Sequence, residues 1–151
     1  MASQKWKFDV FFNFRQQDLD KSFVADLHKR LKDIGINVFK PDVNSEWGEQ
    51  ISTKILEAIE ESRIAVTIFS KDYTSSPRSL EELTKIIECV DNKGQEFFFV
   101  FYKVKPSDGL SPIGTFEADI KGFDLEKVQR WKDALRIADD MAGSRDYFAM
   151  R

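Results

Sequence analysis

Four short apolar runs, separated by polar segments, set the pattern of this chain. Each run is four to six residues long and contains many β-branched and aromatic side chains, which is typical of strands buried on both faces. We therefore expect strands at Phe8–Asn13, Ile36–Phe39, Ile64–Phe69 and Phe97–Phe101. None of the runs approaches the roughly 20 apolar residues that a membrane-spanning helix needs.

Between and after these runs, hydrophobic residues recur every three or four positions, which is the spacing of an amphipathic helix. Such segments cover residues 23–34, 51–59 and 80–90, and a last one follows Asp124, a favourable N-cap. Strands that alternate with helices predict a parallel sheet with helices on both faces. We expect a flavodoxin-like, three-layer α/β fold with five strands, the fifth a short strand near Phe123. One domain should span residues 1–151, with its core at about 7–143.

The stretch from Ile64 to Leu83 places a polar loop at the carboxyl end of a buried strand, where open α/β sheets bind ligands. In the helix that follows, Glu82 falls about 100° from the centre of the apolar face and Glu81 about 160° from it. Glu82 can therefore lean into a cleft beside the sheet, whereas Glu81 should point to solvent. Ser79 is a neighbour of Glu82 on this helix surface. The alternative is a solvated acidic first turn, which suits a helix N-terminus electrostatically.

Composition excludes several classes of protein. The chain has 151 residues and a net charge of −3, so a nonspecific grip on nucleic acid is not expected. A single cysteine, Cys89, excludes an internal disulfide, and it should lie inert on the polar side of its helix. A single histidine, His28, which should lie on the surface, leaves a serine–histidine triad or a histidine metal site with little support. We expect no bound metal, no membrane association and a place in the cytosol or nucleus.

One candidate carboxylate remains after the motifs for other α/β functions are checked. The chain has no glycine-rich dinucleotide fingerprint and no phosphate-binding Walker loop. Glu82 instead faces loops that hold Arg15, Gln16, Asp18 and the Gly48 turn. A single carboxylate can stabilise the cationic sugar centre that forms when a good leaving group departs, as in glycoside cleavage.

Several short motifs follow one another along nearly the whole chain. They are Asp9–Arg15 with Asp18, Gly35–Phe39 with Asp42, Gly48–Ile51, Ala58–Arg63, Phe69–Tyr73, Ser75–Ser76 with Leu80–Leu83, Phe101–Tyr102, Pro106–Asp108 and Gly114–Phe116, with Trp131 in the last helix. In this order they resemble the motifs of plant Toll/interleukin-receptor (TIR) domains. The resemblance implies a role in innate immunity and association with other TIR domains, homotypic or heterotypic.

The resemblance also implies an activity and its residues. Many TIR domains cleave NAD at the nicotinamide–ribose bond when they self-associate, giving ADP-ribose or cyclic variants, so NAD would be the substrate and no cofactor is expected. The family's catalytic glutamate falls on Glu82. The implied substrate-binding positions are Arg15, Gln16, Gln17, Asp18, Gly48 and Ser79, the last in place of the family's cysteine.

Some positions depart from the family's motifs. Gln16 replaces a loop glycine, Trp47 replaces an arginine and Arg78 replaces a tryptophan. Ala25 and Asp26 replace a serine–histidine pair on one self-association surface. A glutamine in a phosphate-facing turn loses the backbone freedom of glycine. A second function therefore stays open, that of a catalytically impaired TIR domain acting as adaptor, decoy or regulator through TIR–TIR binding.

Overall fold

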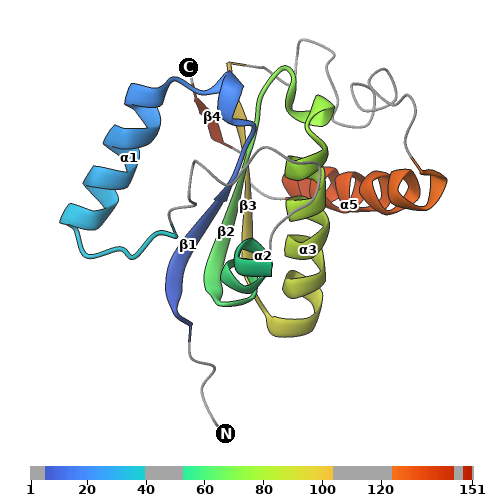
Figure 1. Cartoon of the computed structure of the whole chain (residues 1–151), viewed down its shortest axis with the longest axis horizontal. Helices are drawn as coiled ribbons and strands as arrows, with labels where there is room; N and C mark the ends of the chain where they lie inside the picture. The colour runs from blue at the N-terminus through green and yellow to red at the C-terminus, as the bar shows by residue number, and fades with distance from the viewer. Residues whose placement is uncertain (1–5, 40–52, 104–123, 145–147, 151) are drawn as a thin grey trace, which may run out of the picture.

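A computed structural model describes residues 6–39, 53–103, 124–144 and 148–150 of the chain. Helices and strands alternate through this part, as the sequence predicts (Figure 1). In chain order the elements are β1 (Phe8–Asn13), η1 (Gln16–Asp18), α1 (Lys21–Asp33), α2 (Thr53–Glu60), β2 (Ser62–Phe69), η3 (Tyr73–Ser75), α3 (Pro77–Lys93), β3 (Glu96–Tyr102), α5 (Leu125–Ser144) and β4 (Phe148–Met150).

The sheet is parallel throughout, in the order β1-β2-β3-β4. Beyond β1, the predicted strand at Ile36–Phe39 is reduced to one parallel bridge, between Val38 and Val10. Its position and direction are confirmed, but the extent of the strand is wrong. The Asn37 N–H donates to the Asp9 carboxylate at 2.8 Å instead of to a strand backbone. Counted with this bridge, the order of segments is that of a flavodoxin-like sheet.

The fifth strand expected near Phe123 falls outside the described residues. The position beside β3 is occupied by β4, whose three residues pair in parallel with the end of β3. So short a segment, Phe148–Met150, carries no alternation that a sequence pattern could reveal. The sequence therefore predicts the architecture but does not locate this strand.

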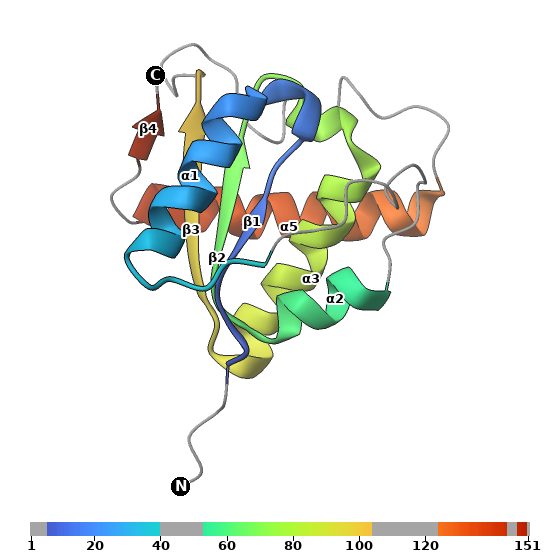
Figure 2. The ribbon, with the colours of Figure 1, turned by 60° about the vertical axis from the view of Figure 1, so that its left-hand side comes forward.

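Helices cover both faces of the sheet, which confirms the three-layer prediction. The helix α1 lies on one face, whereas α2, α3 and α5 lie on the other, and Figure 2 shows the same division from a second side. The larger core lies under the three helices and is rich in phenylalanine: the rings of Phe69, Phe99 and Phe101 contact one another at centroid distances of 5.2 to 5.9 Å. Under α1 the buried cluster is small, and α1 itself has no fully buried residue.

The helix α3 has clear signals at both ends. Ser76 is its N-cap, with Pro77 in the first turn, and Gly94 ends it in the left-handed conformation at φ 72°. Cys89, expected on the polar side of this helix, is 2% exposed and packs in the core. Burial raises the pKa of its thiol, which agrees with an inert residue. Within the described residues, no helix is long and apolar enough to cross a membrane.

Candidate functional site

The site lies where β1 and β2 end and α3 begins, at the carboxyl edge of the sheet. The first turn of α3 is fixed to the end of β1, because the Ser79 hydroxyl donates to the Phe14 carbonyl at 3.2 Å. The cap of α3 reinforces this, since the Ser76 hydroxyl accepts from the Ser79 N–H at 3.2 Å. Ser79 is 2% exposed. It therefore acts by holding backbone segments together.

Glu82 projects inward from α3, as the helix geometry predicts, and is 5% exposed. Both of its carboxylate oxygens accept hydrogen bonds: Oε1 from Asn13 Nδ2 at 3.1 Å and Oε2 from Arg78 Nε at 3.1 Å. A carboxylate in so dry a position interacts strongly with nearby charge, because water screens it little. The arrangement fixes the Glu82 carboxylate in one orientation at the carboxyl edge of the sheet, where open α/β folds bind their ligands.

Asn13, at the end of β1, is the residue that orients this carboxylate. Its side chain is fully buried, and Nδ2 donates both to Glu82 and to the Ser79 carbonyl at 3.0 Å. Its Oδ1 accepts from the Thr67 hydroxyl at 2.9 Å and from the Tyr73 hydroxyl. Sequence analysis did not single out Asn13. The available signal was a lone amide inside a buried aromatic strand, since such a group must be hydrogen-bonded.

Tyr73 supports the same network from the loop before α3. It is fully buried, and burial together with the nearby charge of Glu82 raises the pKa of its hydroxyl well above 10.0. The hydroxyl therefore keeps its proton and remains a donor to Asn13. This holds the Asn13 amide in the orientation that points Nδ2 at Glu82.

The turn after β1, predicted to contact substrate, is tied to the end of β2. Asp18 accepts from Arg15 Nη1 at 2.5 Å through one oxygen. Its other oxygen accepts from the Ser70 hydroxyl at 2.5 Å and from the Asp72 N–H at 3.2 Å. Asp18 therefore anchors the turn. Gln16 and Gln17, in contrast, are exposed on it.

The predictions for Gly48 and Trp47 cannot be compared with the structure, whereas the prediction for Glu81 can. Gly48 and Trp47 lie outside the described residues, so their roles stay predictions. Glu81 was expected to point to solvent, and this is wrong: it is half-buried, and its Oε1 accepts from Trp131 Nε1 at 3.1 Å. The reason is that α5 packs against α3 on that side, which the pattern of one helix cannot reveal.

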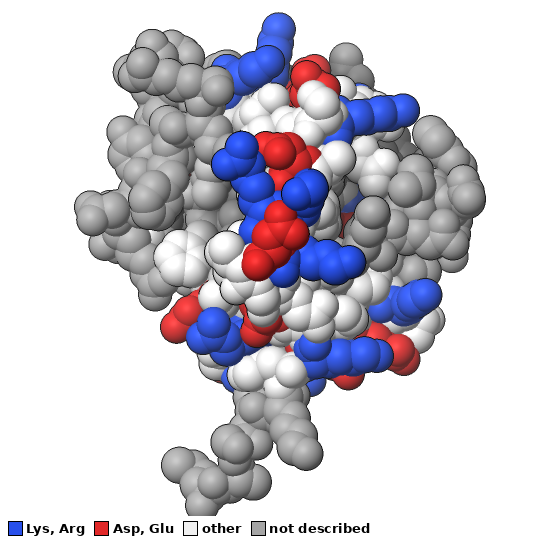
Figure 3. Space-filling model, turned by 90° about the vertical axis from the view of Figure 1, so that its left-hand side faces the viewer, with Lys and Arg blue, Asp and Glu red and all other residues white. Residues whose placement is uncertain are grey.

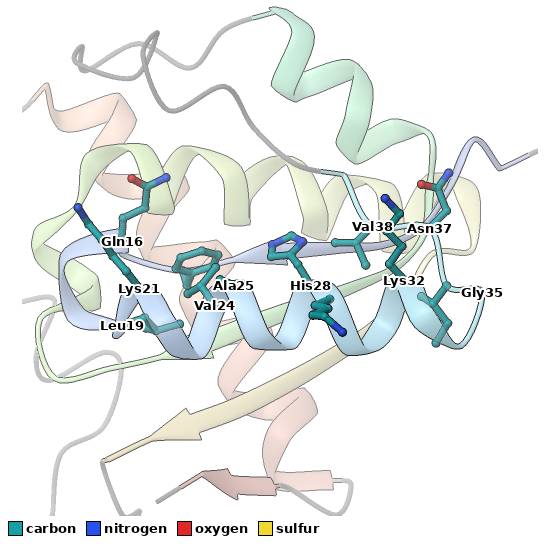
Figure 4. A pocket seen from close by; sticks show the side chains of 13 residues that line it. Gln16, Leu19, Lys21, Val24, Ala25, His28, Lys32, Gly35, Asn37 and Val38 are labelled. Atoms are coloured by element: carbon teal, nitrogen blue, oxygen red, sulfur yellow. The ribbon is translucent and has the colours of Figure 1, made fainter.

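A groove of about 1050 Å³ runs along α1 on the opposite face of the sheet (Figure 4). It extends from Gln16 and Lys21, past His28, to Gly35 and Asn37, and neither Glu82 nor Ser79 lines it. His28 is half-buried there, edge-on to the Phe12 ring, rather than fully on the surface. Across the described part of the chain, no three His, Cys, Asp or Glu residues gather to hold a metal ion.

Within the described residues, fold and site together define a flavodoxin-like α/β domain with a buried carboxylate at the carboxyl edge of its sheet. The TIR domain family model matches residues 7–147. TMV resistance protein N of Nicotiana glutinosa is 38% identical over 151 residues, covering 96% of this chain and 13% of that protein. Disease resistance protein RPV1 of Vitis rotundifolia is 37% identical over 139 residues, covering 90% of this chain and 10% of that protein. The chain belongs to the TIR domain family.

A solved structure gives the same assignment. The TIR domains in the structure of the activated Roq1 resistosome directly recognizing the pathogen effector XopQ match with a TM-score of 0.78 at 34% identity. The match covers 95% of this chain and 87% of that one. The chain is therefore similar in fold to an assembled TIR domain. It spans only about a tenth of the length of the two disease resistance proteins named above.

Proposed function

We propose that this TIR domain serves plant innate immunity by cleaving NAD at the nicotinamide–ribose bond when copies associate, giving ADP-ribose or cyclic ADP-ribose-type products. The observation that carries the proposal is Glu82, a residue 5% exposed whose carboxylate is held at the carboxyl edge of the sheet. The disease resistance functions named for the relatives support the immune role, and the resistosome match supports association with other TIR domains.

The chemistry needs one well-placed negative charge. Nicotinamide in NAD is already cationic, so the ribose C1′–N bond breaks with its electron pair going to nicotinamide, and no general acid is required. Positive charge then develops on the ribose, and the Glu82 carboxylate stabilises it. Water adds to C1′ and releases one proton, which gives ADP-ribose and nicotinamide. In a cyclic product a nucleophilic atom elsewhere in the same ADP-ribose unit takes the place of water.

The predicted substrate positions divide into two roles. Gln16 and Gln17 are exposed on the turn after β1, and Asp18 holds Arg15 on the same turn, so these three side chains are available to contact a dinucleotide. Asp18 and Ser79 shape the site instead, through hydrogen bonds to neighbouring segments.

A second function, TIR–TIR binding without catalysis, is favoured by one observation. Arg78, in place of the family's tryptophan, forms an ion pair with Glu82 and so supplies the carboxylate with a positive partner. A permanently neutralised glutamate would not stabilise a cationic ribose. An adaptor or regulator needs only the surface of the domain.

Nicotinamide release distinguishes the two functions. Purified protein is incubated with NAD in dilute solution and at high density on a vesicle surface, and nicotinamide is measured by chromatography. The enzyme proposal predicts release that rises steeply with density, because association completes the site. No release at either density would favour the adaptor.

A further inference from the structure

The charge partner of Glu82 is a residue of its own helix. Arg78 lies one turn earlier on α3, and its Nε donates to Glu82 Oε2 at 3.1 Å. The two side chains are only 19% and 7% exposed. The pair is therefore mostly screened from water, so each charge strongly affects the other.

This pair opposes the chemistry proposed for Glu82. A guanidinium keeps its charge at all accessible pH values, and it stands next to the carboxylate that should face a cationic ribose. Two cations beside one carboxylate repel each other, so Glu82 can stabilise the transition state only after Arg78 moves away. Asn13 Nδ2 holds the other oxygen from β1. The carboxylate therefore has a second contact that fixes its position when the ion pair opens.

The substrate itself carries a suitable competitor. A dinucleotide has a diphosphate with two negative charges, and a guanidinium binds phosphate oxygens through paired hydrogen bonds. Such a ligand shifts the equilibrium of Arg78 because it binds only the released guanidinium. In NAD the diphosphate is joined to the same ribose whose C1′ carries nicotinamide, so both groups enter the site together.

We propose that Arg78 is a substrate-released counter-ion: a ligand with a diphosphate draws its guanidinium from Glu82, and this release frees the carboxylate for catalysis. The inference rests on the proposed NAD cleavage at Glu82. Arg78 then sets specificity, since dinucleotides carry the releasing group and nicotinamide riboside, which has the same scissile bond, does not. The ion pair keeps the site inactive until a diphosphate arrives.

Binding tests the release without any catalysis. Arginine side chains are labelled with ¹⁵N, and the Arg78 Nε–H resonance is assigned by its loss in Arg78→Gln. We expect inorganic pyrophosphate to shift this resonance toward its position in Glu82→Gln, where no ion pair forms. We also expect Glu82→Gln to bind pyrophosphate more tightly than wild type, because the competing carboxylate charge is gone. An unmoved resonance with equal affinities would overturn the inference, whether or not NAD is cleaved.

The preference for NAD over nicotinamide riboside tests the role of Arg78 in substrate specificity. The ratio of kcat/KM for NAD to that for nicotinamide riboside is measured in wild type and in Arg78→Gln, which keeps a hydrogen-bond donor but removes the charge. We expect the ratio to fall at least about tenfold, from slower NAD cleavage and faster riboside cleavage. Lys85→Gln is the matched control, because Lys85 lies on the same helix as Arg78 but pairs with Glu60 of α2, not with Glu82, and should leave the ratio unchanged. An unchanged ratio in Arg78→Gln contradicts the inference. Pyrophosphate-induced release without nicotinamide release from any variant would show that the ion pair opens, but it would overturn the proposed NAD cleavage and with it the role of release in catalysis.

Discussion

At the scale of single residues, the site depends on a polar network inside an aromatic core. Asn13 joins the first and second strands to α3 through four hydrogen bonds, and each partner is itself buried. Removing a group at the centre of such a network leaves several buried donors and acceptors unpaired, which is costly. The same connections that hold Glu82 in place therefore also stabilise the fold.

Asn13→Ala should lower the free energy of unfolding by about 2–4 kcal/mol, because Thr67, Tyr73 and Glu82 each lose a partner. Urea unfolding monitored by circular dichroism measures this. Asn37→Ala is the control, since Asn37 is exposed and its side chain donates only to the Lys7 carbonyl, at 2.9 Å, among the described residues. It should cost less than about 1 kcal/mol. Equal losses from the two substitutions would refute the network's importance.

Because of the buried hydroxyl of Tyr73, the free energy of unfolding should decrease as the pH rises above about 10. Because the pKa of this group in the folded protein lies above its ordinary value of 10.0, the folded state holds the proton more tightly. The stability that the Tyr73 hydroxyl contributes is fully present below pH 10 and is lost as the pH rises through the folded-state pKa. We expect Tyr73→Phe to be less stable at pH 8 by about 1 kcal/mol and to have a shallower decline above pH 10. Parallel declines in the two proteins would contradict the assignment.

At the scale of elements, α3 carries both the core and the site. Its N-cap contributes both to stability and to the site, because the Ser76 hydroxyl caps α3 and fixes the start of the helix from which Arg78 and Glu82 project. Ser76→Ala should cost about 1 kcal/mol, whereas Ser76→Asp, which keeps an acceptor, should cost much less. Thermal unfolding measures both. Ser75→Ala, at the exposed neighbouring serine, should change stability by less than about 0.5 kcal/mol, and a larger effect there would weaken the capping argument.

The helices and strands themselves could be predicted from the sequence, whereas most contacts between them could not. Short continuous apolar runs predicted β1, β2 and β3, because strands buried on both faces leave that pattern. A hydrophobic repeat every three or four residues predicted every described α-helix, because burial on one face leaves that repeat. Contacts between elements were not predictable in the same way. The Trp131–Glu81 bond depends on how α5 packs on α3, and the Arg78–Glu82 pair depends on side-chain conformation. The direction of Glu82 was predictable because one helix determines it.

At the scale of the whole molecule, the charges on the outer surface of α1 affect how two copies of the domain can associate. Figure 3 shows acidic and basic side chains interleaved over this helix. Asp26, which replaces the histidine of the family's self-association surface, pairs with Arg30 at 2.9 Å, and Lys29 pairs with Asp33 at 3.0 Å. These exposed pairs contribute little to stability, but Arg30 offsets part of the Asp26 charge.

We predict that the wild-type domain self-associates weakly at most in dilute solution, because like charges from two copies of Asp26 oppose a self-complementary contact on α1. Asp26→His should strengthen association, and Asp26→Asn, which removes the charge but adds no ring, should have a smaller effect. Sedimentation velocity over a range of protein concentrations measures this. A tight wild-type dimer that forms through α1 would contradict the prediction.

The most direct test of the account compares two adjacent glutamates of α3. Glu82→Gln keeps the side-chain shape and removes the charge, so nicotinamide release at high density should fall about 100-fold or more, in kcat and kcat/KM together. Glu81→Gln should remain within about threefold of wild type, because its amide oxygen can still accept from Trp131 and it makes no contact with the site in the described part of the chain. Equal rates for wild type and Glu82→Gln, or equal loss from both substitutions, would contradict the role given to Glu82.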